Sequence, residues 1–446
     1  MVVGMAKSGV AAAQLLRMHG AVPVACDSEP LASLPEETRQ ALHGIEFREQ
    51  SPEAWQGANM VVLSPGVPPE IELVQRARAA GIPIVGELEL ASYFLQGKSI
   101  GITGTNGKTT TTALTGHILH ACGIASQVGG NIGTPPSAMV ATSRPDQWNV
   151  LELSSFQTES IDHFCADIAV CLNVTPDHLD RYATFEDYVA AKRRLFEKLG
   201  EASYAVLNAD DEHCVQFAKQ TRAKVLWFSA KRRVGPGIWV EDGEIRYQGE
   251  PVMKAEDIPL RGRHNWENVL AAATVARLSG ASLSQLAAAV RSFEGVEHRI
   301  EFVRRVGGVG FYNDSKATNV DAALKSLDSF GERLFVILGG KDKGSDYGPL
   351  APLLKEKAVA ALLIGQASQK IEAAIRDSVP VVRCGTLEAA VATGYKQARA
   401  GDVVLLAPAC ASFDQFDNYE HRGRAFKQAV AALIDDKGAN KGGAAK

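Results

Sequence analysis

A glycine-rich loop carries the clearest chemical signal in the sequence. The loop reads Thr103-Gly104-Thr105-Asn106-Gly107-Lys108-Thr109-Thr110, between an apolar run that predicts a strand and a segment with a helical pattern. Glycines let backbone N–H groups approach phosphates, and a helix N-terminus adds partial positive charge. We therefore predict a nucleotide-phosphate site in which Lys108 reaches the β- and γ-phosphates and Thr109 holds Mg²⁺. The alternative is a turn of small polar residues, since Ile102 replaces the first glycine of the general Gly-x4-Gly-Lys-[Ser/Thr] pattern.

Two further apolar runs end in polar side chains. Residues 149–153 place Glu152 at the carboxyl end of a predicted strand, and His178 follows the predicted strand at residues 168–173. Because ligands bind at the carboxyl ends of strands in open parallel sheets, both are candidate metal ligands beside the phosphate loop. Taken singly, each could equally be a solvated carboxylate or a surface histidine.

Polar segments also follow predicted elements in the second half of the chain. Asn265 and Asn268 lie three apart on the first turn of an alanine-rich segment, where asparagines commonly cap helices. The runs 312–319, 339–343 and 408–416 each follow an apolar stretch. A second set of strand-end residues is therefore expected there.

The N-terminal segment leaves a different function open. Gly4-Met5-Ala6-Lys7-Ser8-Gly9 resembles the start of a dinucleotide-binding fingerprint, although Ala6 replaces its central glycine, and Asp27 lies where a ribose-binding acid would sit. A dehydrogenase is the corresponding alternative. Only Met1, Val2 and Val3 precede Gly4, whereas a strand usually has about 5–6 residues. We expect the native protein to begin upstream of Met1 or to have lost its opening residues, unless the domain tolerates a short strand.

Length and composition set the fold class. The chain has 446 residues, 46% of them hydrophobic, and apolar runs alternate with helical patterns along most of its length. This rhythm predicts βαβ units with parallel sheets. We expect three α/β domains, at residues 1–87, 88–294 and 295–436, and a disordered Gly/Ala/Lys-rich tail at 437–446.

Charge and cysteine usage exclude several function classes. The net charge of −4 argues against a nucleic-acid surface, and no apolar run approaches the roughly 18 residues of a membrane-spanning helix. The seven cysteines are scattered without a Cys-x-x-Cys pair, which fits reduced thiols in the cytoplasm. The chain is expected to act as a monomer without nucleic-acid or membrane partners.

Three segments of the sequence together resemble the Mur ligase family. They are the phosphate-loop variant, which the related folylpolyglutamate synthases share, Glu152-Leu-Ser-Ser-Phe-Gln157, and the run 173–182. The last two are most similar to the D-glutamate-adding members, and the resemblance is sharpest from Gly101 to Tyr419. It implies Rossmann-like first and last domains around a P-loop-type central ATPase domain. It also implies an ATP-dependent ligase of cytoplasmic peptidoglycan precursor synthesis, which activates UDP-N-acetylmuramoyl-L-alanine as an acyl-phosphate and joins it to D-glutamate.

The resemblance assigns catalytic and metal-binding roles. It implies catalytic functions for Lys108, His178 and Lys192, and two Mg²⁺ ions, one near Thr109 and Glu152 and one near His178. Lys192 is expected to be carbamylated by CO₂, which makes it an oxygen ligand of the kind Mg²⁺ prefers. Without the resemblance, Lys192 is one more helix lysine.

The resemblance also assigns substrate contacts. The implied ATP contacts are Gly104, Thr105, Asn106, Gly107, Lys108, Thr109, Thr110, Asn265, Asn268, Arg299, Asp314 and Lys316. The implied D-glutamate contacts are Thr318, Lys343, Ser412 and Tyr419, with Lys341 as a competitor for the role of Lys343. The implied contacts of the UDP-linked substrate are Lys7, Ser8, Asp27, Ser28, Ser64 and Asn131.

Two other functions remain open from the sequence. A folylpolyglutamate synthase would use the same chemistry without a UDP-binding first domain, so UDP binding separates the two. A non-catalytic, nucleotide-gated binding protein would release no ADP when both substrates are present.

Overall fold

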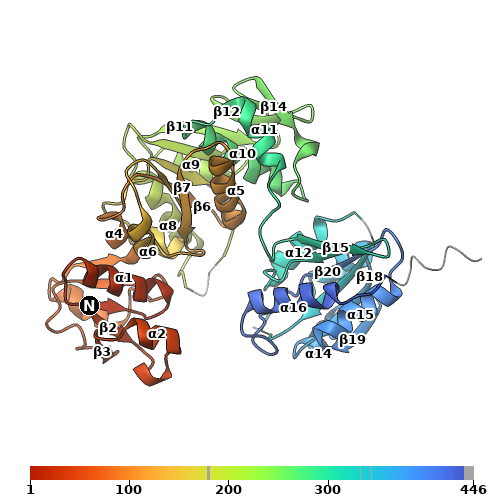
Figure 1. Cartoon of the computed structure of the whole chain (residues 1–446), viewed down its shortest axis with the longest axis horizontal. Coiled ribbons are helices and arrows are strands. Elements are labelled where there is room, and N and C mark those ends of the chain that lie inside the picture. Colours follow the sequence, from red (N-terminus) through yellow and green to blue (C-terminus); the bar gives the residue numbers. More distant parts are fainter. Residues whose placement is uncertain (178–180, 332, 343, 436–446) are drawn as a thin grey trace, which may run out of the picture. The chain divides into compact units, whose positions relative to one another are not determined.

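Three β-sheets organise the protein (Figure 1). The computed structural model describes residues 1–177, 181–331, 333–342 and 344–435, so the predictions for His178, Lys343 and the tail concern residues outside this description. The first two sheets belong to one compact unit, Met1–Pro259 with His264–Phe293. The third sheet belongs to a second unit, formed by Leu260–Arg263 and the described residues from Glu294 onward. The predicted class, α/β with mostly parallel sheets, is confirmed.

The first sheet is wholly parallel, in the order β3-β2-β1-β4-β5. Its central strand β1 has only two residues, and the order reverses between β1 and β4. The second strand begins at Val24, and Val22, two residues before it, is 91% exposed. The elements are β1 (Val2–Val3), α1 (Lys7–Met18), β2 (Val24–Asp27), α2 (Glu36–Ala41), β3 (Glu46–Glu49), β4 (Val61–Leu63), α3 (Glu72–Ala79), β5 (Ile84–Gly86) and α4 (Glu87–Ser92).

The second sheet has the order β14-β13-β12-β11-β10-β9-β6-β8-β7, and β6 lies between β8 and β9. The strands from β7 to β12 are parallel, whereas β12, β13 and β14 form an antiparallel ribbon. The strands are β6 (Lys98–Thr103), β7 (Ser126–Gly130), β8 (Trp148–Glu152), β9 (Ile168–Cys171), β10 (Tyr204–Asn208), β11 (Lys224–Ser229), β12 (Gly237–Glu241), β13 (Glu244–Tyr247) and β14 (Glu250–Lys254). The helices are α5 (Lys108–Ala121), α6 (Pro136–Met139), α7 (Ser155–Thr158), α8 (Phe185–Glu197), α9 (Glu212–Phe217), α10 (His264–Leu278) and α11 (Leu283–Arg291).

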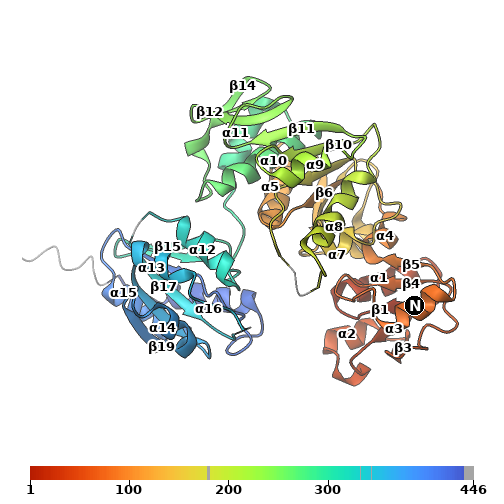
Figure 2. The ribbon, with the colours of Figure 1, turned by 180° about the vertical axis from the view of Figure 1, so that it is seen from behind.

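The third sheet has the order β15-β16-β20-β17-β18-β19 and is parallel except for the β15–β16 pair (Figure 2). The elements are β15 (Glu301–Val306), β16 (Val309–Asn313), α12 (Val320–Asp328), β17 (Leu334–Gly339), α13 (Leu350–Lys357), β18 (Ala358–Ile364), α14 (Ser368–Ile375), β19 (Val381–Gly385), α15 (Leu387–Gln397), β20 (Val403–Leu406) and α16 (Tyr419–Ala431).

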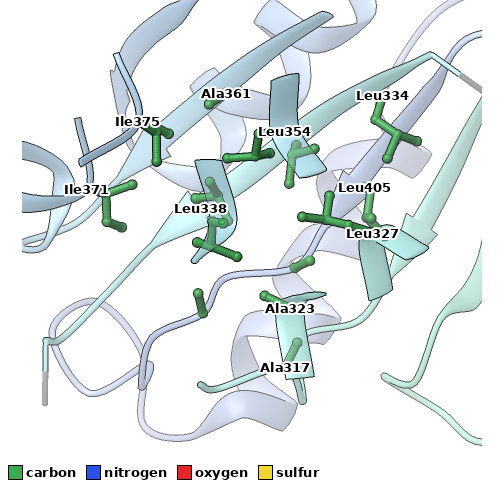
Figure 3. Packing of buried hydrophobic residues seen from close by; sticks show 14 of the residues in the cluster. Ala317, Ala323, Leu327, Leu334, Leu338, Leu354, Ala361, Ile371, Ile375 and Leu405 are labelled. Atoms are coloured by element: carbon green, nitrogen blue, oxygen red, sulfur yellow. The ribbon is translucent and has the colours of Figure 1, made fainter. Parts of the chain in front are cut away.

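Alternating side chains give the third sheet two cores. Leu334 and Leu338 of β17 pack with Leu405 of β20 against α12, α13 and α14, as Figure 3 shows for this cluster. Phe335 and Ile337, the intervening residues of β17, pack against α15 and α16. This period of two places apolar residues on both faces, as a doubly wound sheet requires. The carboxyl ends of its strands are left to loops that can bind ligands.

Two other sequence expectations concern the chain as a whole. All seven cysteines are free thiols. Within the described ranges, no helix is both long and apolar enough to cross a bilayer.

Candidate active site

The phosphate loop connects the central strand β6 to α5 and depends on two glycines. Gly104 has φ +146° and Gly107 has φ +87°, backbone angles that residues with a side chain rarely adopt. A Cβ on Gly107 would lie 2.3 Å from the Asn268 side-chain oxygen. The loop can therefore keep its backbone close to α10 because position 107 is a glycine.

Asn173, which follows β9, holds the phosphate loop by two hydrogen bonds. Its Oδ1 accepts a hydrogen bond from the Asn106 backbone N–H at 2.9 Å, and its carbonyl accepts one from the Thr105 N–H at 2.8 Å. The Thr105 hydroxyl lies 3.1 Å from the Tyr188 hydroxyl of α8. Neither Asn173 nor Tyr188 was predicted as a site residue, although an amide directly after a buried strand was a usable signal.

Two lysines meet at one carbonyl of this loop. The Nζ atoms of Lys108 and Lys192 each donate to the Gly104 oxygen at 2.9 Å. Lys192 is 1% exposed, and its Nζ also lies 4.6 Å from the centroid of the Tyr188 ring. Burial, followed by the charge of Lys108, lowers the pKa of Lys192 to about 7. At neutral pH this lysine is thus partly a neutral amine, which is a nucleophile.

Glu152 ends β8 directly beside the phosphate strand. It is 2% exposed and pairs in register with Ile102 of β6. Its Oε1 accepts from the Asn131 side-chain amide at 3.0 Å, whereas its buried Oε2 has no hydrogen-bond partner in the described part of the chain. A buried carboxylate oxygen left in this way is costly unless a ligand completes it. The residues here therefore fit Mg²⁺, with Glu152 and the buried Thr109 hydroxyl as oxygen ligands.

The two asparagines of α10 face the same loop. The Asn268 side-chain amide donates to Asn265 Oδ1 at 2.8 Å, and its oxygen accepts from the Thr111 hydroxyl at 3.2 Å. Both asparagines are buried, as is Thr110 on the first turn of α5. Asn265 lies inside α10, with its side chain paired to Asn268. The structure thus brings Asn265 and Asn268 to the helix that begins at the phosphate loop.

The predicted UDP-substrate residues gather at the carboxyl ends of β1, β2 and β4. A Cβ on Gly4 would lie 3.1 Å from the Ser64 Cβ, which places the loop after β1 against the loop after β4. Asp27 accepts from the Met5 N–H at 2.5 Å and the Glu29 N–H at 3.0 Å. Lys7 and Ser8 open α1. The sheet order reverses at this point, where open α/β sheets bind ligands. Ser28 follows Asp27 and is exposed, whereas Asn131 lies in the second sheet beside Glu152.

A second cluster lies in the other unit, at the end of β16. Asp314 is buried and accepts a hydrogen bond from the Ser326 hydroxyl. Burial raises the pKa of Asp314, while Ser326 and the nearby Arg299 charge oppose that rise. The Lys316 ammonium lies 5.2 Å from the centroid of the Tyr419 ring. Thr318 follows in the same loop, so predicted nucleotide and D-glutamate residues adjoin here.

Arg422 is a site-positioning residue that the sequence analysis missed. It is 0% exposed, yet it has no acidic hydrogen-bond partner among the described residues. Its guanidinium donates to the Ser315 hydroxyl at 3.0 Å and carbonyl at 2.8 Å, and to the Cys410 carbonyl at 3.2 Å. Arg422 therefore ties the loop after β16 to the loop that carries the buried Ser412. In sequence it is an ordinary helix arginine, and no local pattern identifies it.

One further acidic group resembles a metal site but already has a counter-ion. Ligand atoms of Glu297, His298 and Glu301 lie within 4.8 Å of one another. The Lys427 ammonium donates to Glu297 at 3.0 Å and to Glu301 at 2.7 Å. Because this lysine forms an ion pair with each carboxylate, the group is better described as an ion-pair cluster.

Family models match all three parts of the chain. They describe a Mur ligase MurD-like N-terminal domain at residues 1–86, a Mur ligase middle domain at 102–276 and a Mur ligase glutamate ligase domain at 298–410. Among solved structures, the UDP-N-acetylmuramate–alanine ligase MurC of Thermotoga maritima aligns with a TM-score of 0.61 at 18% identity, covering 96% of this chain and 98% of its own. The MurF ligase of the same organism, in complex with ADP, aligns with a TM-score of 0.60 at 18% identity, covering 84% and 90%. These two likenesses concern the fold.

Curated relatives are much more similar in sequence. The UDP-N-acetylmuramoylalanine–D-glutamate ligase of Solibacter usitatus (strain Ellin6076) is 55% identical over 433 residues, 97% of each chain. The enzyme with that name from Koribacter versatilis (strain Ellin345) is 48% identical over 444 residues, 98% of each chain. With identities of this size over nearly the full length, and family models on all three sheets, this chain belongs to the Mur ligase family.

Proposed function

We propose that the chain is an ATP-dependent ligase that joins D-glutamate to UDP-N-acetylmuramoyl-L-alanine, a step of peptidoglycan precursor synthesis. The observation that carries this proposal is the phosphate loop, where Lys108 and Lys192 share the Gly104 carbonyl beside the half-paired Glu152. The relatives carry this activity in their names. We assign residues 1–87 to the UDP-linked substrate, 88–294 to ATP and 295–436 to the amino acid. The unpaired cysteines support a cytoplasmic enzyme.

The first step activates a carboxylate. The L-alanyl carboxylate attacks the γ-phosphate of ATP, the bond from that phosphorus to ADP breaks, and an acyl-phosphate forms. Lys108 turns from the loop carbonyls to the transferring phosphoryl group and stabilises its charge. Thr109 and Glu152 would hold one Mg²⁺ and His178 a second, and the bound ions would supply neutralisation of the phosphate charge. Oxide is a poor leaving group and phosphate is a good one. This step therefore allows an amine to displace phosphate from the carbonyl carbon of the L-alanyl group.

We further propose that Lys192 works as a carbamate. The ammonium first loses one proton, and the neutral amine then attacks CO₂. A nitrogen–carbon bond forms and the nitrogen loses a second proton, so that a buried cation becomes a buried anion. That anion would remove the repulsion between Lys192 and Lys108 and offer oxygen atoms to a metal. The lowered pKa and the near-complete burial of Lys192 support this proposal.

The second step forms the amide bond. The amine of D-glutamate attacks the acyl-phosphate, and the tetrahedral intermediate collapses with loss of phosphate. We assign the two carboxylates of D-glutamate to Thr318, Lys343 and Ser412, with Tyr419 lining the pocket. A charge-assisted hydrogen bond contributes about 1.5–3 kcal/mol, so Lys343→Ala should raise the KM for D-glutamate roughly ten- to a hundred-fold. Lys341→Ala is the matched control, and a larger effect there would transfer the role to Lys341.

One assay tests the function as a whole. ADP release is measured with UDP-N-acetylmuramoyl-L-alanine and a panel of D- and L-amino acids. We expect release only when the UDP-linked substrate and D-glutamate are both present, and transfer of heavy oxygen from the substrate carboxylate into phosphate. Release with a folate substrate instead would indicate a folylpolyglutamate synthase, and no release with any pair would indicate a binding protein. Absence of heavy oxygen in phosphate would rule out the acyl-phosphate.

A further inference from the structure

Two loops of the third sheet are tightly joined where we propose that D-glutamate binds. The Lys341 N–H, in the loop after β17, donates to the Ala411 carbonyl in the loop after β20 at 2.9 Å. A Cβ on Gly340 would lie 2.2 Å from that same carbonyl. A group that holds one loop therefore affects the position of Ser412, which directly follows Ala411.

The loop after β17 carries an acid among its lysines. Asp342 lies between Lys341 and Lys343 in the sequence. Its Oδ2 accepts from the Lys370 ammonium of α14 at 2.8 Å. Its Oδ1 accepts from the Tyr347 hydroxyl at 2.9 Å and the Ser345 N–H at 3.2 Å. Lys370, and after it Tyr347, hold the pKa of Asp342 below its usual value.

The buried Tyr347 extends this chain of contacts to the second loop. Its hydroxyl, which donates to Asp342, lies 3.0 Å from Cys410 Sγ, and the thiol is the donor in that pair. Tyr347 is 1% exposed and Cys410 is 2% exposed. The carboxylate of Asp342 thus has three described partners, the Lys370 ammonium of α14, the Tyr347 hydroxyl and the Ser345 N–H.

The charge balance of the loop depends on this arrangement. A carboxylate beside two lysines would pair with them and compete with a carboxylate of the substrate, since opposite charges attract most strongly at short range. Paired with Lys370, Asp342 is neutralised from outside the loop. The two flanking lysines then leave a positive field for an acidic amino acid.

We propose that Lys370 is a positioning residue for amino-acid specificity, the counter-ion that keeps Asp342 from neutralising the carboxylate-binding lysine of its loop. This inference rests on the proposed function and adds a residue outside the predicted contacts. Lys370 does not touch the substrate, and it acts through Asp342. Its removal should weaken binding of D-glutamate while leaving ATP and the UDP-linked substrate unaffected.

The test compares four variants of the full chain. Lys370→Met should raise the KM for D-glutamate about two- to five-fold, the range for an exposed ion pair. Lys370→Arg should stay near the wild-type value because it keeps the charge. The double variant Lys370→Met with Asp342→Asn should also have a KM near the wild-type value, because it lacks the Asp342 carboxylate that the loss of Lys370 would release. The matched control is Lys325→Met, since Lys325 pairs with Asp321 at 2.6 Å and is 45% exposed, against 48% for Lys370.

Each outcome decides the proposal. An unchanged KM in Lys370→Met overturns it, and so does a double variant as impaired as Lys370→Met, because that result indicates a structural role. The wild-type assay separates this from the proposed function. If the wild-type chain uses a neutral amino acid or none, the proposed function fails and this inference fails with it. If the wild-type chain uses D-glutamate and Lys370→Met is unchanged, only this inference fails.

Discussion

Among the described residues, one lysine or arginine of each unit has almost no exposed surface, and these two cations differ in their hydrogen-bond partners. In the first unit, Lys192 has one described hydrogen bond, to the Gly104 carbonyl, and the face of the Tyr188 ring. In the second unit, Arg422 donates to the Ser315 hydroxyl and to the carbonyls of Ser315, Cys410 and Ala411. Burial lowers the pKa of both, to about 7 for Lys192 and to about 10 for Arg422.

The difference in partners indicates different roles. A guanidinium with four oxygen partners is stable as a cation, so Arg422 holds two loops together at any physiological pH. An amine with one carbonyl partner and a second lysine nearby is easily deprotonated, so Lys192 is poised to react. The same contrast applies to the acids, since Asp342 has three hydrogen-bond donors and Glu152 leaves one oxygen unpaired. Lys192 and Glu152 are thus buried groups of the candidate active site whose hydrogen bonding a ligand could complete.

The largest expected effect comes from replacing Lys192. Lys192→Ala should lower kcat on the order of 10²–10³-fold, the usual cost of losing one catalytic electrostatic group, and keep the melting temperature close to that of the wild type. Short carboxylic acids should restore part of the activity by supplying the missing anion. Lys198→Ala is the control, since Lys198 is the C-cap of the same helix and pairs with Asp162 at 3.0 Å. Full activity of Lys192→Ala would remove its proposed role.

Replacing Arg422 should instead lower the melting temperature. Arg422→Met leaves several buried acceptors without a donor, each at a cost of about 1–3 kcal/mol, so the apparent melting temperature should fall by roughly 5–10 °C. Arg422→Lys should fall less, because it keeps the charge with fewer donors. The exposed Arg424 on the same helix gives the control, and Arg424→Met should melt like the wild type. Thermal unfolding checks this, and an unchanged transition in Arg422→Met would contradict the assigned role.

The same contrast explains what sequence could predict. The phosphate loop is eight consecutive residues, so its glycines and Lys108 were identifiable, and Glu152 followed from its place at a strand end. Arg422 was not, because its partners Ser315 and Cys410 are brought to it only by the fold. Among the strands, β17 and β20 are continuous apolar runs and were predicted. Strands such as β3, with one apolar residue in Glu-Phe-Arg-Glu, lie at sheet edges and give almost no periodic signal.

A smaller effect is expected from the backbone of the phosphate loop. Gly107→Ala adds a Cβ 2.3 Å from the Asn268 oxygen at φ +87°, so we expect about ten-fold weaker binding of a non-hydrolysable ATP analogue, which corresponds to ~1.4 kcal/mol. Gly123→Ala is the matched control. Gly123 has φ +73°, and no heavy atom lies within 4 Å of its added Cβ. Gly123→Ala therefore has the conformational cost of a side chain at positive φ without a steric clash. Calorimetric titration measures both, and equal affinities would show that Asn268 does not constrain the loop.

The smallest effect is a pH dependence that separates the two buried cations. Lys192 has a pKa of about 7 in the folded protein, whereas an ordinary lysine has a pKa of 10.5. Above pH 10.5 the amine is neutral in both the folded and the unfolded state, and its burial costs no stability. Between the two values the unfolded chain binds a proton that the folded chain does not, so stability falls as the pH falls, by at most about 1.4 kcal/mol per pH unit. Below about pH 7 the cost is constant.

Lys192→Met lacks this titration. In CO₂-free buffer, its advantage in unfolding free energy over the wild type should therefore grow as the pH is lowered from about 9.5 to 7.5, as measured by urea unfolding. Arg422 titrates in a higher window, with a pKa of about 10 against 12.5, so the difference between Arg422→Met and the wild type should stay constant over that range. Added bicarbonate should raise the stability of the wild type and leave the Lys192 slope unchanged, because the carbamate, like the neutral amine, lacks the proton that the unfolded lysine binds. Parallel curves for Lys192→Met and the wild type would mean that Lys192 stays charged in its buried position, and the amine would then be unavailable to CO₂.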